Sequence, residues 1–320
     1  MVRLLNDVDI HALAHLPDVV AQMEGGYRAD ARGEVVLFPR NRYDSERVSL
    51  AWLGAAIPTE GVLGFRSYLS GSDGGDRGHQ LVVLYGYPDM VLRAIFVGRM
   101  LGNLRTGATL AAALRLIEPN VREVGFVGTG TQAKSALACI VATSHLSRII
   151  AWSPNPEHRE QFQNWSERAL HVEVELRSNV ADLVRESPTI VLATAAERTV
   201  ISAEMVSEPR LFLSISAYRR PELDASILDA APRVWTDSVV QASGPGTLFD
   251  SEVRRRKLAP LGQGIADESA RDSSSHRIVV NTGAAWEEVL LGKYLLKRAE
   301  SNNVGVVFEI PESARGLDAF

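Results

Sequence analysis

The chain has 320 residues, of which 46% are hydrophobic and 23% are charged, a composition typical of folded globular domains and unlike that of disordered or fibrous chains. Its formal net charge of −5 gives no broad attraction to a nucleic-acid backbone, so nucleic acid is not expected as a partner. A single cysteine, Cys139, excludes an intrachain disulfide and a thiolate metal cluster, and no apolar stretch reaches the roughly 18 residues of a membrane span, so we expect a cytoplasmic protein with no membrane partner and no bound metal.

The first part of the chain is predicted to combine a helix with a mostly antiparallel sheet. Apolar residues recur at nearly helical spacing over residues 9–31, where Pro17 interrupts the pattern. The glycine- and aspartate-rich segment 71–78 predicts a hairpin loop. Short runs of β-type residues, separated by glycine, proline and aspartate, lie at 35–38, 48–53, 62–69 and 80–85.

From residue 90 the pattern changes to that of a doubly wound domain. We expect a helix over 90–116, followed by alternating β and α segments from 123 to 280. Continuously apolar runs such as 190–193 are typical of parallel strands covered on both faces. A last helix over 286–298 and a strand over 304–310 are expected to return to the first part. The predicted fold class is α/β, with a Rossmann-type parallel sheet beside an α+β domain.

A glycine-rich turn joins the first strand of the doubly wound domain to its first helix. Residues 128–133 read Gly-Thr-Gly-Thr-Gln-Ala, the dinucleotide-binding pattern G-x-G-x-x-A in strand, turn and helix context. Gly128 permits the tight turn, Gly130 lets backbone N–H groups approach a pyrophosphate, and Ala133 permits close packing of the helix on the sheet. The residues expected to bind NAD(P) here are Gly128, Thr129, Gly130, Thr131, Gln132 and Ala133.

The second strand of this domain, 148–152, indicates which dinucleotide is bound. An NAD site offers an acidic residue at the end of this strand to hold the ribose hydroxyls. Here the strand is followed by Ser153, with no carboxylate where the ribose would lie, so a 2′-phosphate is not repelled. Ser153 can donate to that phosphate, and Arg148, His158 or Arg159 could neutralise it. We predict NADP(H) in preference to NAD(H), bound by Ser153 and Arg159 together with Thr194.

With that loop, the run Leu104-Arg105-Thr106-Gly107-Ala108 makes the chain resemble the ornithine cyclodeaminase/mu-crystallin family. The resemblance is nearly full-length. It implies an NAD(P)-binding domain, residues 116–284, inserted between the two parts of a substrate-binding and dimerisation domain, residues 1–115 with 285–320. It also implies a homodimer and a small-molecule substrate whose carboxylate is held by basic residues. The segments that carry it are 39–40, 64–66, 104–108, 128–133, 212–216 and 281–288.

Three arginines match positions at which the family binds the substrate carboxylate. Arg105 stands at the family's carboxylate-binding arginine, and Arg40, or less favourably Arg42, at its first one; an arginine fork pairs bidentately with a planar carboxylate. Arg66 replaces the family's usual lysine. Since no lysine precedes Lys134, a Schiff-base mechanism from this domain is excluded. We expect Arg66 and Arg105 to act in catalysis as well as in binding, although an arginine cannot readily shuttle a proton.

A second departure from the family concerns the segment 214–220. The cyclodeaminase branch carries an aspartate after a Gly-Gly pair there, whereas this chain reads Ser-Ile-Ser-Ala-Tyr-Arg-Arg. Reduction of an imine needs only a hydride donor and a protonated C=N, and water can supply the proton. Tyr218, Glu60 and His79 are alternative proton relays. The resemblance therefore favours the reductase and amino-acid dehydrogenase branches.

We expect an NADPH-dependent oxidoreductase that reduces a small carboxylate-bearing imine, or interconverts a 2-oxo acid plus amine with the corresponding amino acid. Two alternatives stay open. One is a redox-neutral amino-acid cyclodeaminase that recycles its bound NAD, and the other is a non-catalytic, mu-crystallin-like binder that uses NADP to hold a small ligand. Net consumption of NADPH separates them, because only the reductase turns the cofactor over.

Overall fold

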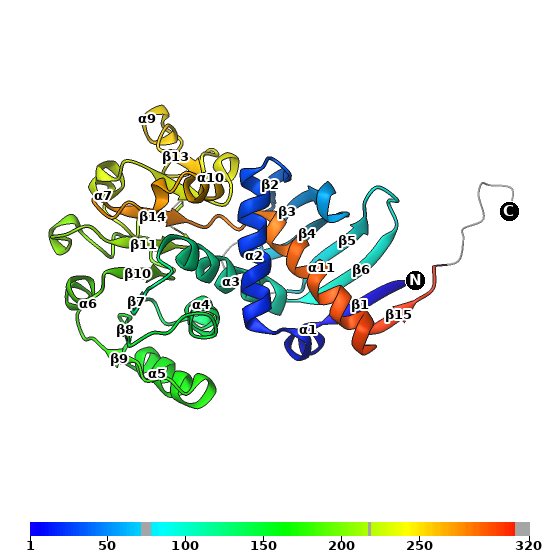
Figure 1. Ribbon diagram of the computed structural model, residues 1–320, viewed down its shortest axis with the longest axis horizontal. Coiled ribbons are helices and arrows are strands. Elements are labelled where there is room, and N and C mark those ends of the chain that lie inside the picture. Colours follow the sequence, from blue (N-terminus) through cyan, green and yellow to red (C-terminus); the bar gives the residue numbers. More distant parts are fainter. Residues whose placement is uncertain (72–77, 217–218, 311–320) are drawn as a thin grey trace, which may run out of the picture.

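The computed structural model describes residues 1–71, 78–216 and 219–310, which form two β-sheets with helices packed on them (Figure 1). The first sheet has the strand order β15-β1-β6-β5-β4-β3-β2, and every neighbouring pair except β1 and β6 is antiparallel. The mostly antiparallel sheet predicted for the first part is therefore confirmed. Its strands are β1 (Val2–Asn6), β2 (Val36–Asp44), β3 (Val48–Ile57), β4 (Val62–Gly71), β5 (Gln80–Gly86), β6 (Leu92–Gly98) and β15 (Val306–Phe308).

The helix predicted over residues 9–31 is divided into two. Asn6 caps α1 (Asp7–Leu13) by accepting hydrogen bonds from the first backbone N–H groups of that helix. A new helix, α2 (Leu16–Ala31), begins with Pro17 in its first turn, where the missing N–H has no intrahelical partner to lose. The interruption expected at Pro17 is thus a boundary between helices.

The prediction of a helix over 90–116 is wrong in its first part. Residues Leu92–Gly98 form strand β6, which pairs with β5 on one side and with β1 on the other. Ala94 and Phe96 are buried while the residues between and beside them are more exposed, which is the period of a strand. Helix α3 (Met100–Ile117) begins only after Gly98, whose φ of +133° is open to glycine alone.

The second sheet is parallel throughout, with the order β13-β12-β14-β11-β10-β7-β8-β9, which confirms the predicted doubly wound fold. Its strands are β7 (Glu123–Val127), β8 (Arg148–Trp152), β9 (Glu175–Leu176), β10 (Thr189–Leu192), β11 (Leu211–Ser214), β12 (Val234–Thr236), β13 (Leu258–Pro260) and β14 (Arg277–Val280). Its helices are α4 (Thr131–Val141), α5 (Pro156–Leu170), α6 (Val180–Glu186), α7 (Ala225–Ala230), α8 (Val239–Ala242), α9 (Glu252–Arg255) and α10 (Leu261–Ala266).

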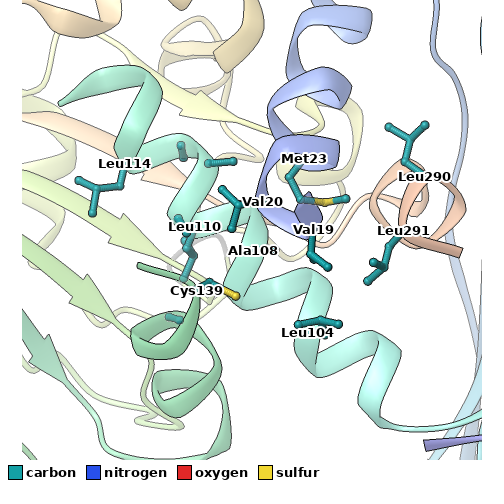
Figure 2. Close-up of a cluster of buried hydrophobic side chains, with 14 of the residues drawn as sticks. Val19, Val20, Met23, Leu104, Ala108, Leu110, Leu114, Cys139, Leu290 and Leu291 are labelled. Atoms are coloured by element: carbon teal, nitrogen blue, oxygen red, sulfur yellow. The ribbon is translucent and has the colours of Figure 1, made fainter. Parts of the chain in front are cut away.

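Helix α3 lies between the two sheets and is buried along most of its length (Figure 1). It contacts α2 and α11 (Ala285–Asn302) towards the first sheet and α4 towards the second. A Cβ at Gly107 would lie 2.4 Å from Ser135 of α4, so only glycine lets the two helices approach so closely. Figure 2 shows the apolar core that these helices share, with labels on Val19, Val20, Met23, Leu104, Ala108, Leu110, Leu114, Cys139, Leu290 and Leu291.

The end of the described chain returns to the first sheet, as expected. Helix α11 follows β14 and packs against β3, β4 and β5, and β15 pairs antiparallel with β1. Both segments thus rejoin elements that lie about 200 residues (α11) and about 300 residues (β15) earlier in the sequence. Among the helices of the described residues, none is both long and apolar enough to cross a membrane.

The half-buried side chain of Asp30 on α2 makes stability depend on pH. Burial and the nearby charge of Asp237 raise its pKa from 3.8 to about 6. The stabilisation from the retained proton is therefore present below the unfolded pKa and is lost as the pH rises through about 6. We expect Asp30→Asn to gain about 2 kcal/mol over the wild type between pH 4.5 and pH 8. Chemical denaturation at both pH values measures the gain, and parallel pH curves for the two proteins would contradict it.

Candidate functional site

The glycine turn after β7 opens into a cleft at the carboxyl ends of the parallel strands. The cleft has a volume of about 550 Å³ and is lined by loop residues 128–132 and by residues that follow β8, β10 and β11. Gly128 has a φ of +99°, and a Cβ there would lie 2.3 Å from the carbonyl oxygen of Ala193. Ala133 does not line the cleft; it is fully buried, which suits its expected role in packing the helix on the sheet.

The start of α4 fits the pyrophosphate of a dinucleotide. Gly130 is the N-cap of α4, and no side chain of the described residues caps the first N–H groups of this helix. A Cβ built on Gly130 would meet no atom within 4 Å, so the space before the helix is open. The first turn therefore presents backbone donors and the positive end of the helix dipole to the cleft.

The residues after β8 form the wall where the adenosine ribose lies in dinucleotide-binding folds of this type. The side chains of Ser153 and Arg159 are both turned to backbone groups: the Ser153 hydroxyl donates to Asn155 at 3.2 Å, and Arg159 donates to the carbonyl of Ser153 at 2.6 Å. Arg159 is therefore bound to the backbone of this wall and is not among the residues that line the cleft. None of the described residues that line the cleft is acidic. Those on this wall are Trp152, Ser153, Pro154 and His158.

Arg148, one of the cations considered for a 2′-phosphate, is directed elsewhere. It begins β8 and therefore lies at the opposite edge of the sheet from the cleft. Its guanidinium donates to Glu175 at 2.8 Å and to Glu186 at 2.6 Å, and Arg177 donates to the same two carboxylates. The idea that Arg148 neutralises a phosphate in the cleft is therefore wrong.

Two of the predicted carboxylate-binding arginines meet in the interior, where β4, α3 and the start of α11 converge. Arg66 and Arg105 are only 6% and 7% exposed. Arg66 donates to Glu288 at 2.6 Å, while Arg105 donates to Glu287 at 2.8 Å and holds its Nε 2.8 Å from Glu288. We call these four side chains the ionic network.

Two glycines leave room for the guanidinium groups of the network. A Cβ at Gly102 would lie 2.8 Å from Oε1 of Gln80 and 3.3 Å from Nη2 of Arg66, which are themselves joined by a hydrogen bond of 2.7 Å. A Cβ at Gly283, where φ is +71°, would lie 2.7 Å from Nη1 of Arg105. A larger residue at Gly283 would displace Arg105, and one at Gly102 would displace Gln80 and press against Arg66.

Arg40 reaches the same region from β2. The register between β2 and β3 is shifted at this point, and such a bulge re-aims the side chains within it. Nη2 of Arg40 donates to the carbonyl groups of residues 282 and 283 at 3.2 and 3.1 Å. Arg42, the alternative from the sequence, is exposed and donates to Ser70. Arg40 is therefore the arginine of β2 that lies beside the network.

The ionic network and Arg40 together carry an excess of positive charge. Burial opposes ionisation of Glu288, but Arg105 and Arg66 hold its pKa below the usual value. Burial raises the pKa of Glu287 well above its usual value, and the nearby negative charges of Asp237 and Glu288 raise it further, against the effect of Arg105. The guanidinium groups of Arg40, Arg66 and Arg105 are therefore balanced only in part by the negative charges of Glu288 and Asp237, because the raised pKa of Glu287 favours its neutral form. This imbalance favours a further anion in a site of low dielectric.

Sequence reasoning missed the acidic partners of the arginines. Glu287 and Glu288 lie in an apolar stretch at the start of α11 and are 0% and 1% exposed; acids in such a stretch are a signal of burial that could have found them. Asp237 follows β12 and accepts hydrogen bonds from the backbone of Thr282 and Ala284 at 2.6 and 2.7 Å. It fixes the turn into α11, a role that no local pattern indicates.

A buried carboxylate also packs against the ends of β10 and β11. Glu222 accepts hydrogen bonds from the backbone N–H of Thr194 at 3.1 Å and from the Ser214 hydroxyl at 3.0 Å. Thr194 lines the cleft, although its hydroxyl also donates to Glu222 and so points into the protein. Glu222 thus joins the ends of β10 and β11 by hydrogen bonds and is fully buried. It is therefore not placed to replace the aspartate of the cyclodeaminase branch.

The candidate proton relays are not brought together. Glu60 pairs with Lys293 at 2.5 Å on the surface, and His79 is exposed. Tyr218 lies outside the described residues. Within the described ranges, no three histidine, cysteine or acidic side chains are grouped so that they could hold a metal ion.

Comparisons with known proteins match this architecture. A model of the ornithine cyclodeaminase/mu-crystallin family matches residues 1–303. Alanine dehydrogenase from Archaeoglobus fulgidus is 24% identical over 322 residues, 94% of this chain and 96% of that protein. The structure of Thermococcus litoralis Δ1-pyrroline-2-carboxylate reductase with NADH and L-proline has a TM-score of 0.84 at 16% identity, covering 96% and 100% of the two chains. An archaeal alanine dehydrogenase dimer with bound NAD has a TM-score of 0.85 at 21% identity, covering 96% and 99%.

Removing the shared carboxylate of the ionic network should destabilise the protein strongly. In Glu288→Ala, the buried guanidinium groups of Arg66 and Arg105 lose their common partner, which we expect to lower the free energy of unfolding by about 3 to 5 kcal/mol. Glu252→Ala is the control, because its ion pair with Arg256 is exposed and contributes at most about 1 kcal/mol. Equilibrium denaturation measures both changes. A loss in Glu288→Ala as small as that of the control would rule out a structural role for the network.

Proposed function

Because the chain belongs to the ornithine cyclodeaminase/mu-crystallin family, we propose that it is an NADPH-dependent oxidoreductase acting on a C–N bond. Its substrate is a small imine that carries a carboxylate; the equivalent reactions are reductive amination of a 2-oxo acid and, in reverse, dehydrogenation of an amino acid. The relatives named above, an alanine dehydrogenase and a Δ1-pyrroline-2-carboxylate reductase, support this class of reaction.

The observation that carries the proposal is the position of the positively charged network beside the dinucleotide cleft. Helix α3 holds Arg105 in the network. Two residues earlier on the same helix, Asn103 accepts a hydrogen bond of 3.0 Å from Gln132, which lines the cleft. Arg105 and the cleft are thus connected through neighbouring residues of α3, and in the proposal a small substrate held by Arg105 extends to the cofactor in the cleft.

The residues of this chain would bind and orient the reactants. Arg105, Arg66 and Arg40 would hold the substrate carboxylate, with the fork of Arg105 as its bidentate partner. The loop 128–133 would hold the cofactor, which supplies the hydride when bound. Burial lowers the pKa of Arg66, but its pairing with Glu288 keeps it a guanidinium, so the proton for the nitrogen comes from water. Most of the rate enhancement then comes from positioning.

One buried contact supports a reductase over a cyclodeaminase. The only acidic side chain among residues 214–224 that reaches the ends of β10 and β11 in the described structure is Glu222, and it is occupied by Thr194 and Ser214. No described carboxylate there is available for amine chemistry. Imine reduction does not require one.

We further propose a homodimer formed through the exposed face of the first sheet. Four apolar side chains on β3, β4 and β5, each at least 36% exposed, share the face opposite α11 by the strand register: Leu50, Trp52, Leu69 and Leu81. A contiguous apolar patch of this kind marks an interaction surface. The dimeric state of the archaeal alanine dehydrogenase supports a second copy of the chain as the partner.

The division into domains and the location in the cell also remain proposals. Residues 1–115 with 285–320 would form the substrate-binding and dimerisation domain, and residues 116–284 the NAD(P)-binding domain. The two sheets support this division, since the described strands of each sheet come from one of the two sets. A cytoplasmic location is supported by the single cysteine, whose thiol is buried and free.

Cofactor preference follows from the uncharged wall after β8. We expect NADPH to bind at least about tenfold tighter than NADH, and Ser153→Asp to reverse the order by placing a carboxylate against the 2′-phosphate. Ser147→Asp, which adds the same charge before the other end of β8, should leave the order unchanged. Fluorescence titration of each protein measures the affinities, and equal affinities for NADPH and NADH in the wild type would refute the preference.

The reaction itself is tested by following NADPH. A reductase should consume NADPH with cyclic imino acids or with 2-oxo acids plus ammonia, and should not convert ornithine with NAD into proline and ammonia. Proline formation without net change in the cofactor would identify a cyclodeaminase. Tight binding of cofactor and carboxylates without any turnover would identify a binding protein.

Substrate anchoring is tested at Arg105. We expect Arg105→Ala to lower kcat/KM by an amount equivalent to about 2 to 5 kcal/mol, because the substrate anion is left unpaired in a closed site. Arg105→Lys should restore only part of this, since a point charge cannot reproduce the fork. NADPH affinity should be kept, because the glycine loop lies on the other sheet. Turnover near that of the wild type, or joint loss of NADPH binding and activity in a variant that remains folded by circular dichroism, would show that the role is wrong.

A further inference from the structure

Asn103 of α3 is held twice by the helix that carries the glycine loop. Nε2 of Gln132 donates to Oδ1 of Asn103 at 3.0 Å. The hydroxyl of Ser135, one turn later on α4, donates to the backbone carbonyl of Asn103 at 2.8 Å. A residue of the cofactor loop is thus hydrogen-bonded to the helix that bears the carboxylate-binding arginine.

Close packing fixes α3 against α4 on the far side of that arginine. The backbone and side chain of Ser135 would lie about 2.4 Å from a Cβ at Gly107, so the helices cannot slide past one another without collision. Arg105 stands between Asn103 and Gly107, the two points of contact. Its position is therefore set from the cleft as well as from its acidic partners in α11.

Gln132 also has an acceptor without a partner. Its Oε1 is buried and receives no hydrogen bond from the described residues, while its Nε2 is held by Asn103. A buried acceptor in this state is unfavourable, and a turn of the side chain that exposes Oε1 to a donor of a ligand in the cleft would relieve it. The side chain that holds Asn103 is therefore sensitive to what occupies the cleft that it lines.

We propose that Gln132 and Asn103 are a positioning pair that couples occupation of the cleft by NADPH to the orientation of Arg105, so that the cofactor strengthens binding of the substrate carboxylate. The proposal rests on the proposed function, because it assigns NADPH to the cleft and the carboxylate to Arg105. Neither residue of the pair contacts the carboxylate. By thermodynamic reciprocity, the carboxylate strengthens NADPH binding by the same factor.

The coupling has a physical reason in the ionic network. Arg105 is engaged by Glu287 and Glu288, so accepting a third carboxylate requires its guanidinium to shift within a buried site. Such a shift is sensitive to the small movements of α3 that the contact between Gln132 and Asn103 permits or prevents. When NADPH fills the cleft, it would fix the side chain of Gln132. Gln132 would then hold α3 in the arrangement in which Arg105 accepts the substrate carboxylate.

Calorimetry with two probes tests the pair without requiring turnover. The probes are NADPH and pyrrole-2-carboxylate, a planar carboxylate that is not a C=N hydride acceptor. In the wild type, NADPH should tighten pyrrole-2-carboxylate binding by at least about fivefold. Asn103→Ala and Gln132→Ala should each reduce that enhancement to about twofold or less, and the double variant should be no worse than either single variant, since both remove one contact.

Conservative variants separate positioning from folding. Gln132→Met keeps the length of the side chain but can neither donate a hydrogen bond to Asn103 nor add charge to the cleft, so it should lose the enhancement while keeping the thermal midpoint of the wild type. The exchange of Asn103→Gln with Gln132→Asn keeps the combined length of the two side chains and should restore most of the enhancement. NADPH affinity measured alone should change by less than about threefold in Asn103→Ala, because Asn103 does not line the cleft and the backbone donors of the loop remain.

Arg115→Ala is the matched control. It removes contacts at the far end of α3, where Arg115 donates to the carbonyl of Thr143 just after α4 at 2.9 Å and to Glu24 of α2 at 2.8 Å, and it should keep the full enhancement. No enhancement in the wild type, an undiminished one in Asn103→Ala, or additive losses in the double variant would overturn the positioning pair. A different result would contradict the proposed function: the wild type shows the enhancement and the variants lose it, but the protein never consumes NADPH with any of the substrates tested.

Discussion

The buried pairing of Arg66 and Arg105 with Glu287 and Glu288 is the interaction on which the rest of the molecule depends. It joins β4 and α3, formed early in the chain, to α11, which begins only after the second sheet is complete. A guanidinium taken out of water without a partner is strongly unfavourable, so these arginines cannot occupy the interior until α11 has returned. The contact that closes the fold is therefore also the contact that gathers the arginines proposed to bind a carboxylate.

The same junction includes α3, which also contacts Gln132 of the glycine loop, and glycines determine how closely the parts approach. Gly102 and Gly283 leave space for the two guanidinium groups, and Gly107 lets α3 lie directly against α4. The three glycines lie at different contacts, but a Cβ added at any of them would come within 2.8 Å of a neighbouring group. Glycines along α3 thus let this helix pack closely both on the ionic network and on α4. In the proposed function, this packing brings the carboxylate-binding arginine and the cofactor cleft together.

Local patterns predicted the parts of the fold that local physics controls. The turn at Gly128 and the parallel sheet followed from strand, glycine and helix order, and Arg40, Arg66 and Arg105 followed from family positions. Strand β6 was missed because its apolar run continues into an apolar helix, and only pairing with β1 and β5 distinguishes the two. The acidic partners of the arginines were missed because that pairing spans 182 residues between Arg105 and Glu287, a distance over which sequence spacing carries no information.

The replacement of lysine by Arg66 changes what the site can do chemically. A lysine at this place can lose its proton and act as a base or form an imine with a substrate, whereas a guanidinium paired with Glu288 remains a fixed positive charge. A fixed positive charge in the protein repels a protonated C=N and so raises the free energy of the bound iminium. This repulsion decreases in the transition state, because hydride addition removes the positive charge of the iminium. In the proposed reaction, the substrate carboxylate offsets part of this field and allows the iminium to bind. The remaining positive charge then assists the step in which the iminium becomes a neutral amine, so the substitution suits reduction of a C=N bond better than chemistry that needs a basic nitrogen in the protein.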